Sequence, residues 1–287
     1  MIKKIIPLLL AAIFIPTFAF DWPQEAIMSD MFFSYFGQLR GGMISTSLVF
    51  ADTSDIQAAD DGHIIAVINE YDDDSCFFPS ALGNAVIIAH QNDLLTIYGN
   101  IDKETLTPSV YTDETVAAGT VFGSSGNSGW QHGHSSLEFQ TFDTKNGNVI
   151  NPRVLMPRIG EELPLTLTGI TLENKETRYD LLVQRTLPAG VYRVYRQRQH
   201  VAIPYKTRIT INGVIVDEIS YDQLIQNGTL VYASGRRKNY SKEALYPDER
   251  LQLLGEVTLT PGRNALGMTL TDILGAEKST AYSLTIY

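Results

Sequence analysis

The chain has 287 residues, of which 44% are hydrophobic and 19% are charged, and its formal net charge is −10 at pH 7. Residues 20–160 carry 18 acidic and 5 basic side chains, whereas residues 161–287 carry 14 and 15. The acidic first half argues against nucleic acid as a partner, because its phosphates attract lysine and arginine. Cys76 is the only cysteine, which excludes an intrachain disulfide. The length suffices for two hydrophobic cores.

Residues 1–19 have the features of a cleavable secretory signal. Two lysines precede an apolar run that ends at Pro16, and Thr17 and Ala19 form a small-residue exit. The run is shorter than the roughly 20 apolar residues that a membrane-spanning helix needs. We therefore expect an exported protein without a transmembrane segment after signal removal, in the periplasm or cell envelope.

Residues 20–42 are interpreted as an N-terminal arm, in which residues 24–40 fit either a short helix or an irregular segment over a barrel rim. Residues 43–157 contain short β-branched and aromatic runs separated by Gly, Asn and Asp, which predicts an all-β domain. The predicted strands are HIIAVINEY, NAVIIAH, DLLTIYGN, TVFGS and SLEFQTF.

Proline and glycine residues between 152 and 164 predict a domain boundary. Residues 165–287 then predict a second all-β domain, a single β-sandwich, from regularly spaced strands and turns. The final segment resembles the closing strands of bacterial immunoglobulin-like domains. The runs are TLTGITL, LLVQRTL, VYRVYRQ, TRITINGVIV, TLVYAS, LLGEVTLT, NALGMTLTD and AYSLTIY.

Four blocks within residues 43–157 resemble, in order and spacing, the LytM or lysostaphin-type zinc peptidases that cut peptidoglycan cross-links. The resemblance implies the antiparallel β-fold of that family, the duplicated hybrid motif. It also implies a zinc ion held by a His, by an Asp after three intervening residues, and by the second His of a His-x-His pair, which leaves one position for water. The blocks are AADDGHIIAVINE, LGNAVIIAHQNDLLTIYGNI, ETVAAGTVFGSSGNSGWQHGHSSLEFQ and GNVINPRVLM.

The first ligand pair of the family falls in the stretch ISTSLVF when the block is anchored on the Asp61-Gly62 pair downstream. The His position is then Ser45 and the Asp position is Val49. A shift of the register by a residue or two does not restore the pair, because residues 24–62 contain no histidine.

The His-x-His pair falls before Leu137, Glu138 and Phe139, which match the aromatic-Glu-apolar ending of the family block. The first His is then His134, and the second is replaced by Ser136. Alternation along a strand places His134, Ser136 and Glu138 on one face and buries Leu137 with Phe139 on the other.

A rival register uses His132 and His134 as the metal pair and requires a bulge that accommodates two extra residues. Two imidazoles without a third ligand make a weak zinc site.

The Tyr-x-His motif of the family aligns with IYGNI, so that Asn100 replaces its histidine. An Asn side chain can donate a hydrogen bond, but it cannot take up and release a proton as histidine does. We therefore expect a retired active site with vestigial His134 and Asn100, and no bound cofactor. Bound zinc is expected only under the alternative interpretation, in which the protein is an active zinc endopeptidase.

A substrate groove inherited from the family would be lined by Tyr98, Trp130, His132, His134 and Glu138, since aromatic faces suit sugar or peptide contacts. For Tyr98 and Trp130, ordinary core packing is the equal alternative.

Other polar clusters have simpler interpretations. His63 and His90 are placed at strand ends, and His200 in an exposed loop. The acidic residues at 70 and 72–74 fit a solvated hairpin tip better than a calcium loop, and the basic run at 236–238 fits a solvated loop better than a site for anions.

Three functions remain open. The first is a catalytically inactive LytM-like module that binds peptidoglycan or a cell-wall hydrolase such as an amidase, as the resemblance to degenerate relatives implies. The second is an active zinc endopeptidase with unorthodox ligands. The third is a structural envelope or adhesion protein. Zinc content together with peptidoglycan cleavage separates the first two.

Overall fold

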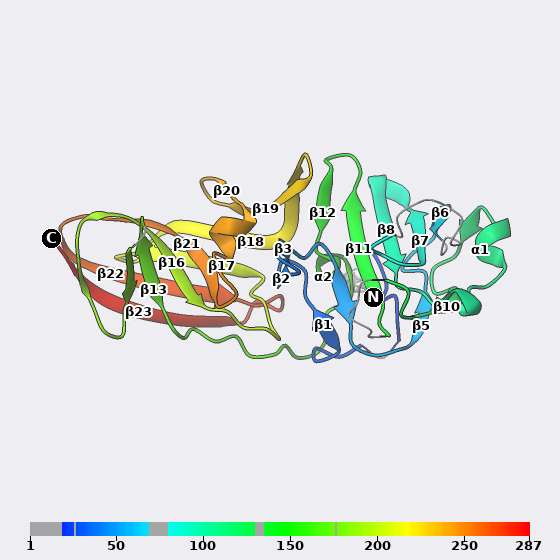
Figure 1. Cartoon of the computed structure of the whole chain (residues 1–287), viewed down its shortest axis with the longest axis horizontal. Helices are drawn as coiled ribbons and strands as arrows, with labels where there is room; N and C mark the ends of the chain where they lie inside the picture. Colours follow the sequence, from blue (N-terminus) through cyan, green and yellow to red (C-terminus); the bar gives the residue numbers. More distant parts are fainter. Residues whose placement is uncertain (1–18, 26, 69–79, 130–134, 176) are drawn as a thin grey trace, which may run out of the picture.

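The computed structural model describes residues 19–25, 27–68, 80–129, 135–175 and 177–287. The described chain is nearly all β, as predicted. It is elongated, with an N-terminal lobe (residues 19–160) and a C-terminal lobe (residues 161–287), and the C-terminus lies at the far end of the second lobe (Figure 1). All but the last residue of the predicted signal lies outside the described residues, as does Cys76.

The N-terminal lobe contains the five strands predicted between residues 63 and 142, at residues 62–68, 85–89, 94–99, 121–124 and 138–143, together with short strands that were not predicted. The strands are β1 (Phe32–Ser34), β2 (Leu39–Arg40), β3 (Met43–Ile44), β4 (Leu48–Phe50), β5 (Asp55–Gln57), β6 (Gly62–Ile68), β7 (Ala85–Ala89), β8 (Leu94–Gly99), β9 (Thr115–Val116), β10 (Val121–Ser124), β11 (Glu138–Asp143) and β12 (Asn148–Ile150). The helices are single turns: η1 (Gln91–Asp93), η2 (Lys103–Thr105), α1 (Ser109–Thr112) and α2 (Pro152–Leu155).

Strand alternation divides the main sheet of this lobe into a core face and an outer face. Phe139 of β11 lies opposite Tyr98 of β8, and their ring centroids are 5.0 Å apart. Phe122 of β10 packs edge-on against Tyr98 at 5.1 Å. All three rings are buried. Glu138 precedes Phe139 and therefore points to the outer face.

The strands of the C-terminal lobe form two layers around a second core. β14, β13, β16 and β21 make one sheet, while β15, β23, β22, β17 and β18 belong to the large sheet. The elements are β13 (Thr171–Asn174), β14 (Thr177–Asp180), β15 (Thr186–Leu187), β16 (Gly190–Gln197), β17 (Lys206–Ile211), β18 (Val214–Asn227), β19 (Leu230–Gly235), β20 (Asn239–Tyr240), α3 (Lys242–Leu245), β21 (Leu251–Leu259), β22 (Gly262–Thr271) and β23 (Glu277–Ile286).

Two predicted strands of this lobe are mostly wrong. In the run TLTGITL, only Thr171 and Leu172 lie in a strand. The run LLVQRTL forms a turn in its first part, with Leu182 68% exposed and Val183 85% exposed, and only Thr186–Leu187 is a strand. Asp180 explains the turn, because its carboxylate accepts a hydrogen bond from the backbone N–H of Leu182 at 2.8 Å.

The two lobes share one hydrogen-bonded sheet (Figure 1). The last part of β18 pairs antiparallel with β12, with Asn148 opposite Ile225 and Ile150 opposite Gln223. The segment predicted as a domain boundary, residues 152–164, contains the single turn α2 and otherwise no strand or helix. The lobes are therefore connected by a ladder of backbone hydrogen bonds as well as by the chain.

The structure of the N-terminal arm decides between the short helix and the irregular segment that the sequence left open. Its described residues form short strands and turns rather than a helix. The side chains of Phe36 and Leu39, and of Ile44 just after the arm, pack in a third hydrophobic core. This core also contains residues of the second lobe, including Tyr221 and Leu253. The arm thus packs between the lobes.

A buried polar network, which we call the joint, completes this contact. Arg196 is 0% exposed, and its guanidinium donates to Gln252 Oε1 through Nε at 3.0 Å and Nη2 at 2.8 Å. Its Nη1 donates to the carbonyl of Thr166 at 2.6 Å. Burial lowers the pKa of Arg196 to about 10. The Tyr246 hydroxyl extends the network to the arm by donating to the Gly37 carbonyl at 2.7 Å.

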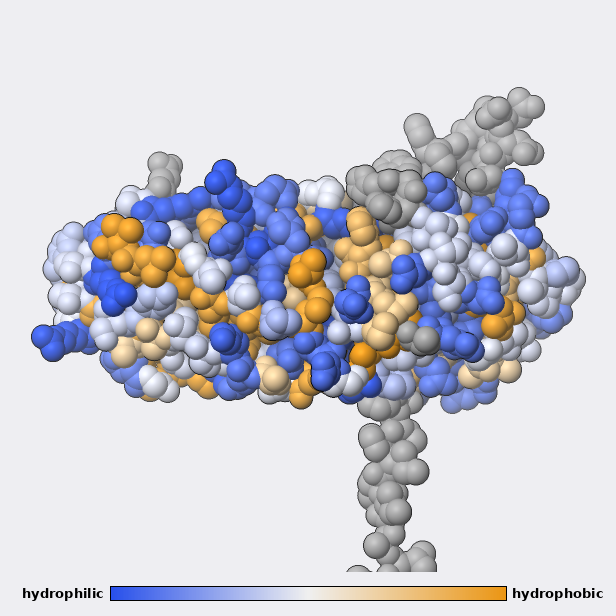
Figure 2. Space-filling view, turned by 90° about the horizontal axis from the view of Figure 1, so that it is seen from below, coloured by the Kyte–Doolittle hydropathy of each residue, from blue (hydrophilic) through white to orange (hydrophobic). Residues whose placement is uncertain are grey.

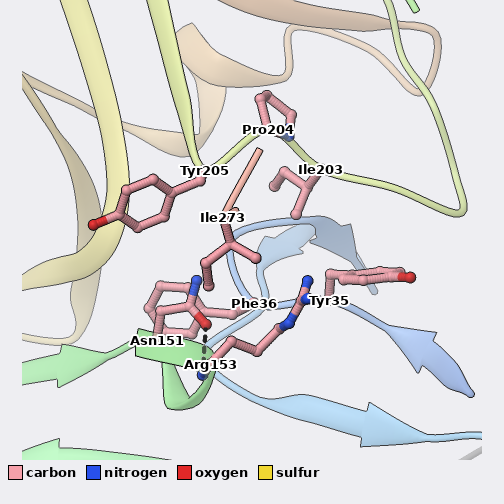
Figure 3. A pocket seen from close by; sticks show the side chains of 8 residues that line it. All are labelled: Tyr35, Phe36, Asn151, Arg153, Ile203, Pro204, Tyr205 and Ile273. Carbon is pink, nitrogen blue, oxygen red and sulfur yellow. Dashed lines mark hydrogen bonds between the residues drawn. The ribbon is translucent and has the colours of Figure 1, made fainter. Parts of the chain in front are cut away.

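Between the lobes lies a cavity of about 10 Å³, which is room for about one water molecule. Figure 3 shows residues of both lobes converging on it, with Tyr35 and Arg153 from one side and Tyr205 and Ile273 from the other. Asn151 caps α2 there by accepting a hydrogen bond from the Arg153 N–H at 3.1 Å. The lobes therefore meet in a close-packed interface.

The face seen in Figure 2 carries apolar and hydrophilic residues side by side along both lobes. Such mixing is ordinary for a folded protein, because apolar atoms make up more than half of most protein surfaces. Among the residues that the structure describes, no helix has the length and apolar character needed to cross a bilayer.

Candidate functional site

Ser45 and Val49, the positions of the first ligand pair, lie around the start of β4. Ser45 is 6% exposed, and its Oγ donates to the Ser47 carbonyl at 3.1 Å. Val49 is 0% exposed and lies opposite Glu138 of β11. Residues directly opposite on paired strands point to the same face. The Val49 isopropyl group therefore lies beside the Glu138 side chain, on the outer face of the sheet.

The Glu138 carboxylate is satisfied by the protein itself. Its Oε1 accepts a hydrogen bond from Ser47 Oγ at 2.7 Å, and its Oε2 pairs with Arg40 Nη1 at 3.2 Å. The side chains of Arg40 and Glu138 are 20% and 11% exposed. Arg40 belongs to the arm, so a guanidinium from the arm supplies the positive charge next to this carboxylate.

Asn100, the residue at the Tyr-x-His position, holds a loop in place. It has a left-handed backbone with φ of 65°, which Asn tolerates better than most residues. Its Nδ2 donates to the carbonyls of Gly126 and Ser136, both at 2.6 Å, and its Oδ1 accepts from the Gly129 N–H at 2.7 Å. The amide therefore serves as a structural clamp.

Ser136, the position of the second His, is also buried, with 0% exposed. Its Oγ has no hydrogen-bond partner among the described residues. Leu137 and Phe139 are both 0% exposed, so the predicted burial of this pair is confirmed. Trp130, His132 and His134 lie outside the described residues.

Tyr98 is a correction to the predicted groove. It is 0% exposed and packs in the first core, and its Oη accepts a hydrogen bond from the Ala59 N–H at 2.8 Å. Burial raises its pKa to about 12. Its place on β8, opposite Phe139, turns it away from the outer face. Tyr98 therefore lines no groove, and core packing is the correct alternative.

A groove of about 570 Å³ opens next to Ser45 and Glu138. This volume lies in the range of ligand-binding clefts, about 300–1,000 Å³. Its walls come from both lobes: the first lobe contributes the stretch around β3 and β11, and the second contributes the hairpin of β18 and β19. The lining residues are Arg40, Gly41, Met43, Ile44, Ser45, Thr46, Ser47, Ala81, Leu82, Glu138, Gln140, Thr229 and Val231.

Most of these residues had no signal in the sequence. Arg40 reaches Glu138 from 98 positions away, and Thr229 belongs to the other lobe. Among the predicted groove residues that the structure describes, Glu138 lines the groove and Tyr98 does not. Strand alternation was the signal for Glu138, because it placed this side chain opposite to the buried Phe139.

The remaining histidines have the predicted locations. His63 lies at the start of β6, and His90 lies between β7 and η1. His90 Nε2 is 2.7 Å from Thr96 Oγ1 and its Nδ1 is 2.9 Å from the Asp61 carbonyl oxygen. Burial lowers the pKa of His90. His200 is exposed in a bend.

The charged clusters fit the simple interpretations where they are described. The basic run at 236–238 is an exposed turn between β19 and β20, and Lys238 Nζ pairs with Glu256 at 2.8 Å. The acidic residues at 70 and 72–74 lie outside the described residues.

The three predicted ligand positions do not fit zinc. They offer two hydroxyl groups and an isopropyl group, whereas zinc sites in proteins use thiolate, imidazole and carboxylate ligands. Within the described part of the chain, no three His, Cys, Asp or Glu residues are grouped so that they could hold a metal ion. The rival pair of His132 and His134 is outside that part.

Two family models and a relative match parts of the chain. Residues 45–152 match the family model "Peptidase family M23", and residues 164–287 match a separate model that carries no functional description. The chain is 29% identical over 120 residues to a protein of Treponema pallidum described as "Uncharacterized protein", which covers 39% of this chain and 79% of that protein.

Two solved structures resemble part of the chain. A mutant of the catalytic domain of the prophage-encoded M23 protein EnpA from Enterococcus faecalis has 23% sequence identity and a TM-score of 0.34, covering 42% of this chain and 88% of that chain. The complex of SpoIIIAH and SpoIIQ contains a chain with 17% identity and a TM-score of 0.36, covering 46% of this chain and 96% of that chain.

Proposed function

We propose, from the premise that residues 45–152 form an M23 (LytM-like) domain, that the protein is an exported, catalytically inactive relative of the M23 peptidases. In this proposal its groove binds a peptide of the cell wall or of a wall hydrolase such as an amidase, and regulates wall cleavage. The second domain, proposed to be immunoglobulin-like over residues 165–287, supplies one wall of the groove.

The observation that carries the proposal is the chemistry of the old metal site. Val49 offers no donor atom, and the Ser45 hydroxyl is engaged with the Ser47 carbonyl. The amide of Asn100 is held by three backbone groups. An ion held by fewer than three good ligands would not be retained at ordinary metal levels. The groove beside these residues supports a role in binding.

The decisive experiment combines elemental analysis with a digestion assay. We expect purified protein to carry well under one zinc ion per chain and to leave peptidoglycan sacculi intact, while it co-sediments with sacculi or with a purified wall amidase. About one zinc per chain, lost together with sacculus cleavage on chelation, would establish the active endopeptidase instead.

A co-sedimentation result that is negative for both sacculi and amidase, in protein without zinc, would favour the structural or adhesion protein. The matched control is Ser45→Ala with Ser136→Ala. If these hydroxyls hold no metal, the double variant has the same zinc content as the wild type.

A further inference from the structure

We infer that the groove selects an uncharged, extended peptide segment of a protein partner, rather than a charged fragment of peptidoglycan. This inference rests on the proposed binding function and names the ligand class of the same site. It depends on three properties of the groove: its construction from both lobes, the pairing of its charges, and the kind of side chain that lines it.

The wall supplied by the second lobe is fixed in position. The hairpin of β18 and β19 is paired within itself, with Asn227 opposite Leu230. On its other edge, β18 pairs with β12 of the first lobe. Thr229 and Val231 face the groove, and Leu230 lies between them in the chain and does not line it. The groove is therefore formed before a ligand arrives, which lowers the entropy cost of binding.

The charges in the groove are already paired. Arg40 and Glu138 are the charged members of the described lining, and they contact one another at 3.2 Å. Ser47 also donates to Glu138 at 2.7 Å. A carboxylate or ammonium group on a ligand would lose water without gaining a new counter-charge, which is unfavourable. A neutral segment avoids this cost.

The rest of the lining combines aliphatic and hydroxyl groups. Met43, Leu82 and Val231 offer apolar contact, while Thr46 and Thr229 offer hydroxyl groups. Met43 is 58% exposed and so is available to a ligand. The lining comes from four stretches of chain, within residues 40–47, 81–82, 138–140 and 229–231, and the site is open to solvent, a trough rather than a closed hole. Such a trough fits an extended peptide with small aliphatic and hydroxyl side chains.

The test is a positional-scanning library of acetylated and amidated hexapeptides, measured for binding to the purified protein. We expect enrichment of Ala, Val, Ser and Thr, and depletion of Asp, Glu, Lys and Arg. Thr229→Glu should weaken the best peptide by about tenfold or more, because it places an unpaired charge in the groove. Leu230→Glu is the matched control, since Leu230 is the exposed neighbour of Thr229 but does not line the groove, and it should change binding by less than about twofold.

Soluble muropeptides, released from sacculi with a muramidase, form the second arm. If they bind more tightly than every neutral hexapeptide, or if the library enriches charged residues, the inference is overturned while the proposed binding function stands. Equal effects of Thr229→Glu and Leu230→Glu overturn it as well, as does a library without enrichment. Circular dichroism of both variants verifies that they are folded, and zinc-dependent cleavage of the muropeptides would instead defeat the proposed function.

Discussion

The joint and the groove are both built from polar residues where the two lobes meet, but they treat those residues differently. In the joint, Arg196 is 0% exposed, and its guanidinium donates to the buried Gln252 side chain and to the Thr166 carbonyl. In the groove, Arg40 and Glu138 remain partly accessible to water. Buried polar networks are costly to alter, whereas accessible ones tolerate change. The difference indicates that the joint determines the fold and that the groove is open to functional change.

The largest effect should come from breaking the joint with Arg196→Met. We expect the free energy of unfolding to fall by about 3 kcal/mol, because Gln252 Oε1 and the Thr166 carbonyl lose a charged donor. Urea denaturation measures this change. Arg193→Met is the control: Arg193 is 43% exposed in its ion pair with Glu256, and its loss should cost less than about 1 kcal/mol. Equal losses in the two variants would contradict the contrast.

The arm offers a second way to disturb the joint. Gly37 has φ of +82°, and a Cβ there would lie 2.7 Å from Tyr221 Cδ1. Gly37→Ala should therefore lower the free energy of unfolding by about 2 kcal/mol through backbone strain and steric conflict. Gly41 has φ of +57°, and no atom lies within 4 Å of the place where a Cβ would be added. Gly41→Ala therefore measures the backbone strain alone, at about 1 kcal/mol. If thermal unfolding shows no difference between them, Tyr221 does not restrict the arm.

Glu138→Gln tests how much the ion pair in the groove contributes to stability. Gln keeps an oxygen for Ser47 but loses the ion pair with Arg40, so the expected loss in the free energy of unfolding is about 1 kcal/mol. Glu249→Gln, in a pair whose carboxylate is 74% exposed, should have no measurable effect. A loss for Glu138→Gln as large as that of Arg196→Met would mean that the groove is as structural as the joint.

The smallest effect concerns pH, and it should involve neither region. Burial lowers the pKa of His90 from its ordinary value of 6.5, so the folded state favours the neutral ring and the unfolded chain binds more protons. Stability contributed this way is full above about pH 6.5 and declines as the pH falls from there toward the folded pKa. Melting temperatures between pH 5 and 8 should show a decline that His90→Gln reduces and the exposed His63→Gln does not. An unchanged profile in His90→Gln would exclude this cause.

The sequence predicted most strands, because alternation and turn residues are local signals. Leu137 and Phe139 illustrate this, since their shared burial followed from spacing alone. The run beginning at Leu181 was wrongly predicted as a strand, because its apolar residues are exposed in a turn that Asp180 stabilises. The sheet shared by β12 and β18 was not predicted, since pairing between residues about 75 positions apart leaves no local pattern.

The candidate site was less predictable than the strands, because its residues come from distant parts of the chain. Position in a strand correctly indicated the direction of Glu138, but Arg40 and Thr229 reach the groove through the path of the arm and the packing of the second lobe. Tyr98 was placed equally well in a groove or a core by its residue type, because an aromatic ring suits both. Only its register opposite Phe139 decides for the core.

The shared sheet has a consequence for synthesis. When the ribosome has completed β12, its partner strand β18 is still more than 60 residues away, which corresponds to several seconds at about 5–20 residues per second. During that interval one side of β12 carries unsatisfied amide and carbonyl groups, a template for association with other nascent chains. A chain shortened before β18 would keep these groups of β12 unpaired in the finished protein.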